Sequence, residues 1–342
     1  MSKKLPSLGV LGPSPEDKRD YKYQNRLRAK SVSIEKTDFP SKFLLVDSLL
    51  KPRNQGSIGS CAAQTAACVV EALNFEQYGT RDYMSPSFVY GLRYTRPDDA
   101  GMYMRNVCKI LHAVGMVKEE TLSYQFAPTC QIADPWRDGW DEETLGKIPN
   151  IKEAQSYKIG EYRSVAQDVQ EMKAALHSEK APLMIAVPVY IRHSEDTYRN
   201  RMWKYEKGDK NAGGHAMAMV GWDDDVVAYD GCQPGAFLIR NSWGTSWGES
   251  GYTWFPYEDL MTKREADIEN YSEHPNMPYP VATPMPWEIW AVIDAADIVP
   301  DPEPEPEPEP ESNSKQSITG WIVAAIALGL PILLLIAYAL MR

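Results

Sequence analysis

Three residues that lie far apart in the chain carry side chains suited to nucleophilic catalysis. Cys61 follows the glycine-containing stretch 54–60, His215 follows a pair of glycines, and Asn241 ends an apolar run. An imidazole beside a thiol accepts its proton, and an amide oxygen on the other ring nitrogen fixes the imidazole tautomer. The sequence therefore predicts a thiolate nucleophile, a base and an orienting amide in one site.

A helix is predicted to position the cysteine. Ala63, Ala66, Val70 and Leu73 recur at helical spacing after Cys61, and Gly79 ends the run. At the first turn of a helix, a thiolate is favoured by the helix dipole and by free amide groups. A packed cysteine would be the ordinary interpretation of Cys61 alone, but the other two residues favour catalysis.

Two strands are predicted to position the histidine and the asparagine. Residues 216–222 follow His215 and residues 237–240 precede Asn241, and both stretches are mostly apolar. Each strand would then place one polar residue at its end, beside glycines.

The motifs that contain these residues carry a family resemblance. Asn-Gln-Gly-Ser-Ile-Gly-Ser-Cys at 54–61, Gly-Gly-His at 213–215 and Asn-Ser-Trp-Gly-Thr-Ser-Trp-Gly at 241–248 resemble papain-like cysteine peptidases, the papain and cathepsin family. The resemblance spans about 39 to 291 and is nearest to bacterial and large-DNA-virus members. It implies a two-lobed α+β fold, helical from about Phe43 to Gln155 and strand-rich from about Ser156 to Ala296.

The resemblance also implies a role for each motif residue. Cys61 is the expected nucleophile, His215 the base and Asn241 the orienting amide. The side chain of Gln55 and the backbone N–H of Cys61 are expected to form the oxyanion hole. Trp243 is expected to shield the bond between the histidine and the asparagine from water.

Other positions are less clearly matched. Gly101 and Ala216 are the candidates for binding substrate backbone. Ile58 and Ala62 stand where the family usually has a disulfide-bonded cysteine and an aromatic residue. The five cysteines show no zinc spacing, so neither a disulfide framework nor a metal site is predicted, and no cofactor is expected.

The predicted reaction is hydrolysis of a peptide or protein substrate through an acyl-enzyme thioester. Two alternatives remain open at this point. One is an inactive, membrane-anchored scaffold or envelope protein on a peptidase fold. The other is an acyl-transfer enzyme such as a transglutaminase or an amidase.

Charge separates a basic arm from an acidic body. The 342 residues carry a net charge of −11, which argues against a nucleic-acid partner, yet residues 1–42 hold five more basic than acidic side chains. We expect this N-terminal arm to lie along the cleft of a peptidase domain at 43–298 and to restrain it, with Tyr21 and Tyr23 as apolar anchors. A disordered tail is the alternative.

The C-terminal region predicts attachment to a membrane. Residues 299–317 form an acidic, proline-rich stalk, and residues 318–341 contain no charge over 24 positions, enough for a helix that crosses a lipid bilayer. Residues 1–30 do not resemble a signal peptide. We therefore expect a single-pass, tail-anchored protein whose catalytic domain faces the cytosol, at a viral or host internal membrane.

Overall fold

The structure, a computed structural model, describes residues 8–30, 38–93, 101–124, 136, 140–192, 202–203, 209–260 and 286–294. All of these residues belong to a compact unit that spans residues 1–301. Within the described ranges, no helix combines the length and the apolarity needed to cross a membrane. The predicted stalk at 299–317 and the predicted span at 318–341 lie outside those ranges.

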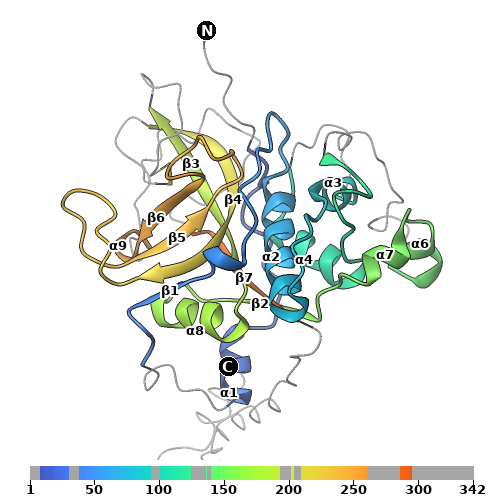
Figure 1. Cartoon of the computed structure of the whole chain (residues 1–342), viewed down its shortest axis with the longest axis horizontal. Helices are drawn as coiled ribbons and strands as arrows, with labels where there is room; N and C mark the ends of the chain where they lie inside the picture. The colour runs from blue at the N-terminus through green and yellow to red at the C-terminus, as the bar shows by residue number, and fades with distance from the viewer. Residues whose placement is uncertain are drawn as a thin grey trace, which may run out of the picture. The chain divides into compact units, whose positions relative to one another are not determined.

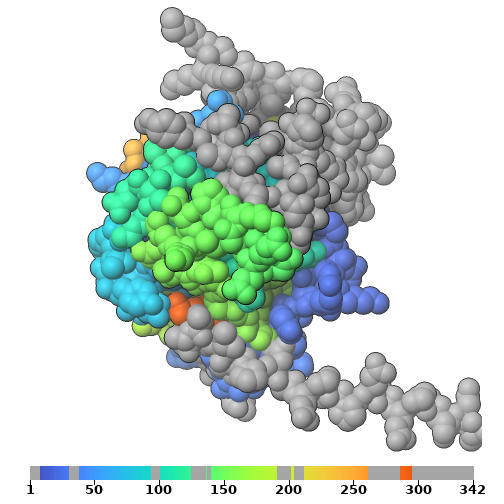
Figure 2. Space-filling model, turned by 90° about the vertical axis from the view of Figure 1, so that its right-hand side faces the viewer, coloured from blue at the N-terminus to red at the C-terminus, as the bar shows by residue number. Residues whose placement is uncertain are grey.

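Helices gather on one side of this unit and a sheet on the other (Figure 1). The helices on the first side are α2 (Cys61–Tyr78), α3 (Pro86–Gly91), α4 (Met104–Ala113), α6 (Glu142–Gly146) and α7 (Ile151–Gln155). Figure 2 looks onto this side, where the cyan-to-green residues of these helices form much of the coloured surface. The other helices in the described ranges are α1 (Tyr23–Ala29), α8 (Val169–Glu179), α9 (Tyr257–Leu260) and the short 3-10 helix η2 (Val46–Ser48).

The helix α2 is the central element of the helical half, and its predicted position is confirmed. It begins at Cys61 and ends against Gly79, whose φ of 68° gives the left-handed cap that glycine accepts without strain. Every residue of α2 from 61 to 74 is buried. Its alanines allow the close approach of neighbouring elements, so α2 is enclosed on all sides rather than amphipathic.

The second half is a largely antiparallel sheet with the strand order β2-β7-β3-β4-β5-β6, and β1 pairs with β4. The strands are β1 (Lys42–Leu44), β2 (Glu161–Ser164), β3 (Leu183–Arg192), β4 (Asp209–Asp223), β5 (Ala236–Arg240), β6 (Tyr252–Pro256) and β7 (Glu288–Ile293). The prediction that the helical half begins at Phe43 is wrong there, because Phe43 pairs with Trp222 of β4. The sheet therefore includes both the first strand of the domain, β1, and the last, β7.

The long strand β4 brings the two predicted strands into register. Ala218 of β4 lies opposite Arg240 of β5, so the chain leaves β5 at Asn241, close to His215. Gly221 of β4 makes the pairing with β1 possible, because a Cβ there would lie 2.2 Å from the carbonyl oxygen of Phe43. Only glycine lets β1 approach β4 so closely.

The N-terminal arm is fixed to the sheet side by α1. Tyr23 and Arg26 are fully buried, and both donate to the carboxylate of Glu179 on α8, at 2.6 Å and 2.9 Å. Tyr23 is thus an anchor, as predicted. Tyr21 is not, because 58% of its surface is exposed.

Candidate active site

Cys61 lies at the boundary between the helical half and the sheet. It is the first residue of α2 and is completely buried. Its Sγ accepts a hydrogen bond from the backbone N–H of Ala216 at 3.4 Å. The sulfur therefore lies beside the residue that follows His215, although 154 positions separate the cysteine from the histidine.

His215 and Asn241 are joined directly. The Nε2 atom of His215 lies 2.7 Å from Oδ1 of Asn241, and this oxygen also accepts the backbone N–H of Ser242 at 2.7 Å. Because the oxygen can only accept, the imidazole hydrogen belongs on Nε2. The Nδ1 atom of His215 is buried without a hydrogen-bond partner. That nitrogen is the one left to act as a base.

An indole covers the bond between the histidine and the asparagine. The ring of Trp243 stacks on His215 with centroids 4.5 Å apart and an interplanar angle of 29°. Trp247 packs edge-on against Trp243 at 5.6 Å. Excluding water in this way strengthens the polar contact beneath the rings.

Gln55 is held at the same site by polar contacts on both ends of its amide. Its Oε1 accepts the hydroxyl of Ser242 at 2.6 Å, and its Nε2 donates to the carbonyl of Ile58 at 2.9 Å. Tyr124 supports the loop, because its hydroxyl donates to the carbonyl of Gln55 at 2.9 Å. The predicted oxyanion donor is therefore fixed in a buried position before any ligand arrives.

The arm crosses this site as an extended segment. The N–H of Val10 donates to the carbonyl of Gly214 at 3.1 Å, and the carbonyl of Gly9 accepts the N–H of Met102 at 2.8 Å. Val10 pairs parallel to Met102 and antiparallel to Gly214, so the arm bridges the two halves. Gly101 adjoins it, since a Cβ at that position would lie 2.8 Å from the Gly9 oxygen.

Burial changes the charge state expected from the sequence. It raises the pKa of Cys61 to about 11, although backbone N–H groups, those of Ala216 and Gly9 among them, oppose the shift. Burial also lowers the pKa of His215 to about 4, although the hydrogen bond that its Nε2 donates to Asn241 acts in the opposite direction. The helix start therefore does not make Cys61 a thiolate in this structure, because these pKa values leave both side chains neutral at pH 7.

Some residues of the site were not predicted. Ser242 connects Gln55 to Asn241, and its position inside the Asn-Ser-Trp-Gly motif was a usable signal. Tyr124 lies 2.5 Å from the hydroxyl of Ser60, and nothing in its surrounding sequence marks it. Met102 pairs with the arm through its backbone, and a backbone contact of this kind cannot be predicted from a pattern of side chains.

Metal chemistry finds no support among the described residues. They contain no group of three or more histidine, cysteine or carboxylate side chains arranged to hold an ion. Cys61, Cys68, Cys108 and Cys232 are all free thiols. Cys68 is buried within α2, as predicted for a core side chain.

Comparison with known proteins decides the family. Residues 41–273 match the papain family of cysteine proteases. The chain belongs to this family and is a papain-like cysteine peptidase. The match covers α2, β4 and β5, which carry or lead directly to Cys61, His215 and Asn241.

Individual relatives agree with this family. An uncharacterized peptidase C1-like protein of Acanthamoeba polyphaga mimivirus is 24% identical over 64% of this chain and 68% of its own length. Cathepsin B-like CP2 of Giardia intestinalis is 30% identical over 49% of this chain and 50% of its own length. The chain thus spans 50% to 68% of the length of these curated relatives.

A solved structure supports the predicted papain-like α+β fold. Xylellain, a cysteine protease from Xylella fastidiosa, is 27% identical with a TM-score of 0.59. The alignment covers 85% of this chain and 98% of xylellain. A bacterial and a viral protein are therefore both similar to this chain.

Proposed function

We propose that this peptidase hydrolyses peptide bonds with Cys61 as nucleophile, His215 as base and Asn241 as orienting amide. The observation that carries the proposal is the state of the imidazole. Asn241 holds Nε2, and the bare Nδ1 remains buried next to the residue whose N–H touches the Cys61 sulfur. An imidazole held in this tautomer is ready to take the thiol proton.

The reaction then proceeds in two halves. The sulfur of Cys61 bonds to the scissile carbonyl carbon while His215 takes its proton, and the same proton passes to the amine that leaves as the C–N bond breaks. Water next attacks the thioester, giving one proton to His215, which returns it to the departing sulfur. Gln55 and the Cys61 N–H are proposed to bind the carbonyl oxygen as it becomes negative.

A thiol-directed peptidyl epoxide tests this function. The Gly9→Ala variant, in which the arm is displaced, should gain the mass of one probe at Cys61, and the peptide fragments that it releases should carry a new carboxylate. Labelling without hydrolysis would favour the scaffold alternative. Products in which the acyl group is bonded to an amine, and not to a hydroxyl from water, would favour acyl transfer. The family assignment does not favour that alternative.

We further propose that the arm keeps the enzyme latent. The backbone groups that would bind an extended substrate, on Met102 and Gly214, are already paired with residues 9–11. The arm presents an N–H to the sulfur at Gly9, not a carbonyl carbon, so the arm blocks the nucleophile without being attacked. Burial raises the pKa of Cys61 to about 11, and the Gly9 N–H of the arm only partly opposes this shift.

Membrane attachment remains a separate proposal that rests on the sequence. The uncharged stretch 318–341 is long enough to cross a bilayer, and the stalk 299–317 would hold the enzyme away from its surface. The lipid bilayer partner and the cytosolic orientation depend on this segment alone. Its test is fractionation of a truncated chain, described below.

A further inference from the structure

The loop that carries the proposed oxyanion donor is held by a tyrosine from another part of the helical half. The hydroxyl of Tyr124 lies 2.5 Å from the Oγ of Ser60 and donates to the backbone carbonyl of Gln55 at 2.9 Å. Ser60 directly precedes Cys61 in the chain. One hydroxyl therefore contacts the residue before the proposed nucleophile and the residue that supplies the proposed oxyanion donor.

The chemistry of these groups fixes the direction of both hydrogen bonds. Burial raises the pKa of the Tyr124 hydroxyl, so the hydroxyl keeps its proton at pH 7. A carbonyl oxygen can only accept, so this single proton is used at Gln55. The hydroxyl of Ser60 must then donate to the Tyr124 oxygen. The result is an ordered chain of donors from Ser60 through Tyr124 to Gln55.

The contact with Tyr124 also explains why Ser60 does not cap its helix. Ser60 is the N-cap residue of α2, where a serine hydroxyl usually accepts an N–H from the first turn. The fully described helix α2 receives no such side-chain cap. The N–H groups of Cys61 and Ala62 act on the Cys61 sulfur instead, and both oppose the rise in its pKa. Tyr124 thus holds the Ser60 hydroxyl away from amides that belong to the site.

Tyr124 is itself fixed to the helical half. Its backbone N–H donates to the carboxylate of Glu119 at 2.9 Å, and the N–H of Glu119 donates to the carbonyl of Tyr83 at 2.7 Å. The hydroxyl of Ser85, the N-cap residue of α3, donates to the carbonyl of Leu122 at 2.5 Å. The phenol therefore extends from a segment that is tied to the start of α3.

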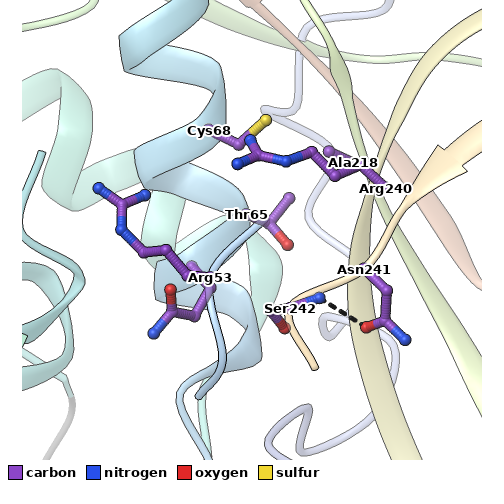
Figure 3. Close-up of a pocket in the computed structure, with 8 residues that line it drawn as sticks. Arg53, Thr65, Cys68, Ala218, Arg240, Asn241 and Ser242 are labelled. Atoms are coloured by element: carbon purple, nitrogen blue, oxygen red, sulfur yellow. Dashed lines mark hydrogen bonds between the residues drawn. The ribbon is translucent and has the colours of Figure 1, made fainter. Parts of the chain in front are cut away.

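The side chain of Gln55 is secured from the sheet half of the site. Ser242 donates its hydroxyl to the Oε1 of Gln55 and its backbone N–H to Asn241, and Figure 3 shows the second bond. Ser242 therefore holds the side chain of Gln55, whereas Tyr124 holds its backbone. Both need to be fixed, because misplacing a catalytic group by about 1 Å can greatly reduce the rate.

We propose that Tyr124 is a positioning residue for the oxyanion hole, which holds the Gln55 backbone and the Ser60 hydroxyl in the arrangement that the reaction needs. The inference rests on the proposed function, because it takes Gln55 and the Cys61 N–H as the oxyanion donors. In this role Tyr124 touches neither substrate nor the reacting atoms. Its loss should therefore weaken catalysis by less than the loss of Gln55.

Kinetics of Tyr124→Phe test this role. The variants are made in the full chain carrying Gly9→Ala, the parent, and are compared on one peptide in non-ionic detergent. Tyr124→Phe should lower kcat by roughly 3-fold to 12-fold, the range expected for one neutral hydrogen bond, with KM little changed. A peptide aldehyde, whose adduct with Cys61 places an oxygen in the oxyanion hole, should bind more weakly by a similar factor.

Tyr257→Phe is the matched control. Tyr257 is half-buried like Tyr124, and its hydroxyl donates to Asp224 at 2.7 Å in the sheet half. This variant loses one hydroxyl without touching the loop 55–60, so its kcat and aldehyde affinity should equal those of the parent. A Tyr124→Phe variant that also equals the parent, or that differs only in KM, would overturn the proposal.

Ser60→Ala tests the ordered chain of donors. Ser60 and Tyr124 act through one contact, so removing the serine hydroxyl should reduce kcat in the parent but add little to the loss in Tyr124→Phe. Fully additive losses would overturn the ordered chain, because they would show that the two hydroxyls act independently.

Hydrogen exchange gives an answer that needs no peptidase activity. Backbone amides of residues 55–60 should exchange faster in Tyr124→Phe than in the wild-type full chain, and at the wild-type rate in Tyr257→Phe. Faster exchange in a chain that hydrolyses no peptide would support the positioning contact and contradict the proposed function alone. Equal exchange in Tyr124→Phe and the wild type would overturn the inference.

Discussion

The hydroxyl of Ser242 donates to the Oε1 of Gln55 at 2.6 Å, across 187 positions of sequence. The backbone repeats the connection, because the N–H of Gln55 donates to the carbonyl of Ser242 at 2.8 Å. Since the Ser242 N–H also holds Asn241, one serine fixes the proposed oxyanion donor and the orienting amide together. Ser242 is thus a positioning residue at the junction of the two halves.

Substitution at Gln55 should impair turnover more than substrate binding. Removing one preorganised oxyanion donor typically costs about 2.7 to 4 kcal/mol, so Gln55→Ala should lower kcat by roughly a hundredfold to a thousandfold. Ser242→Ala should reduce kcat by a smaller factor, because the Gln55 amide remains but loses the hydrogen bond from the Ser242 hydroxyl. Steady-state kinetics on one peptide measures both, and a change confined to KM would contradict the oxyanion role.

The two cysteines of α2 should differ sharply. Cys61→Ser should abolish hydrolysis while leaving the unfolding temperature nearly unchanged, because the thiolate is the bond-forming atom. Cys68→Ala is the matched control on the same helix and should retain turnover, at a modest cost in stability from its buried position. Loss of activity in Cys68→Ala, with activity kept in Cys61→Ser, would show that the nucleophile was misassigned.

Much of the site could be predicted because its residues lie in local motifs. Cys61 begins a helix whose extent follows from the apolar spacing and from Gly79. Asn241 begins the motif Asn-Ser-Trp-Gly-Thr-Ser-Trp-Gly, which is typical of the family. The position of Phe43 could not be foreseen in the same way. Its strand is three residues long and exists only because Gly221, far along the chain, lets it approach. Tertiary pairing of this kind leaves no local pattern.

The arm shows a second limit of sequence reasoning. Net charge suggested that a basic arm is drawn to an acidic body, so that salt would weaken the contact. The structure instead fixes the arm with a buried pair, Arg26 and Glu179, whose side chains are 0% and 3% exposed. Salt screens such pairs poorly. High salt should therefore release the arm far less than a substitution that disrupts its packing.

Acid should loosen the arm. The ordinary pKa of the histidine is 6.5 and burial lowers it to about 4, so a His215 that is exposed to water takes up a proton that the buried form refuses. Falling pH between these values therefore favours the uncovered or unfolded state, by at most about 3 kcal/mol. Hydrogen exchange of residues 8–14 should quicken between pH 6.5 and 4.

A variant that cannot titrate at this position isolates the effect. His215→Gln should lose the part of the pH dependence that comes from the imidazole. The part that comes from Glu288 should remain with the opposite sign, because burial raises the pKa of this carboxyl beside Ser14, so that protonation of Glu288 favours its buried state. Identical pH profiles for the wild type and His215→Gln would assign the acid response entirely to other groups.

The proposed membrane attachment should reside in the C-terminal stretch alone. Truncation after Ser317 removes 318–341, so the shortened chain should leave carbonate-washed membranes and retain its activity on peptides. Deletion of residues 301–311, within the stalk, is the control and should keep the chain in the membrane fraction. Retention of the truncated chain on washed membranes would mean that another part of the protein binds lipid.

Latency should depend on one glycine of the arm. A Cβ at Gly9 would lie 1.9 Å from the carbonyl oxygen of Gly59, a backbone atom that cannot move aside alone. Overpacking of this kind typically costs about 1 to 3 kcal/mol, so Gly9→Ala should raise the uncovered fraction, and with it activity on small peptides, by roughly 5-fold to 150-fold. Gly146→Ala, where an added Cβ meets nothing within 4 Å, is the matched control. Alkylation of Cys61 at pH 7 should quicken in Gly9→Ala only, and equal rates in both variants would mean that the arm does not restrain the enzyme.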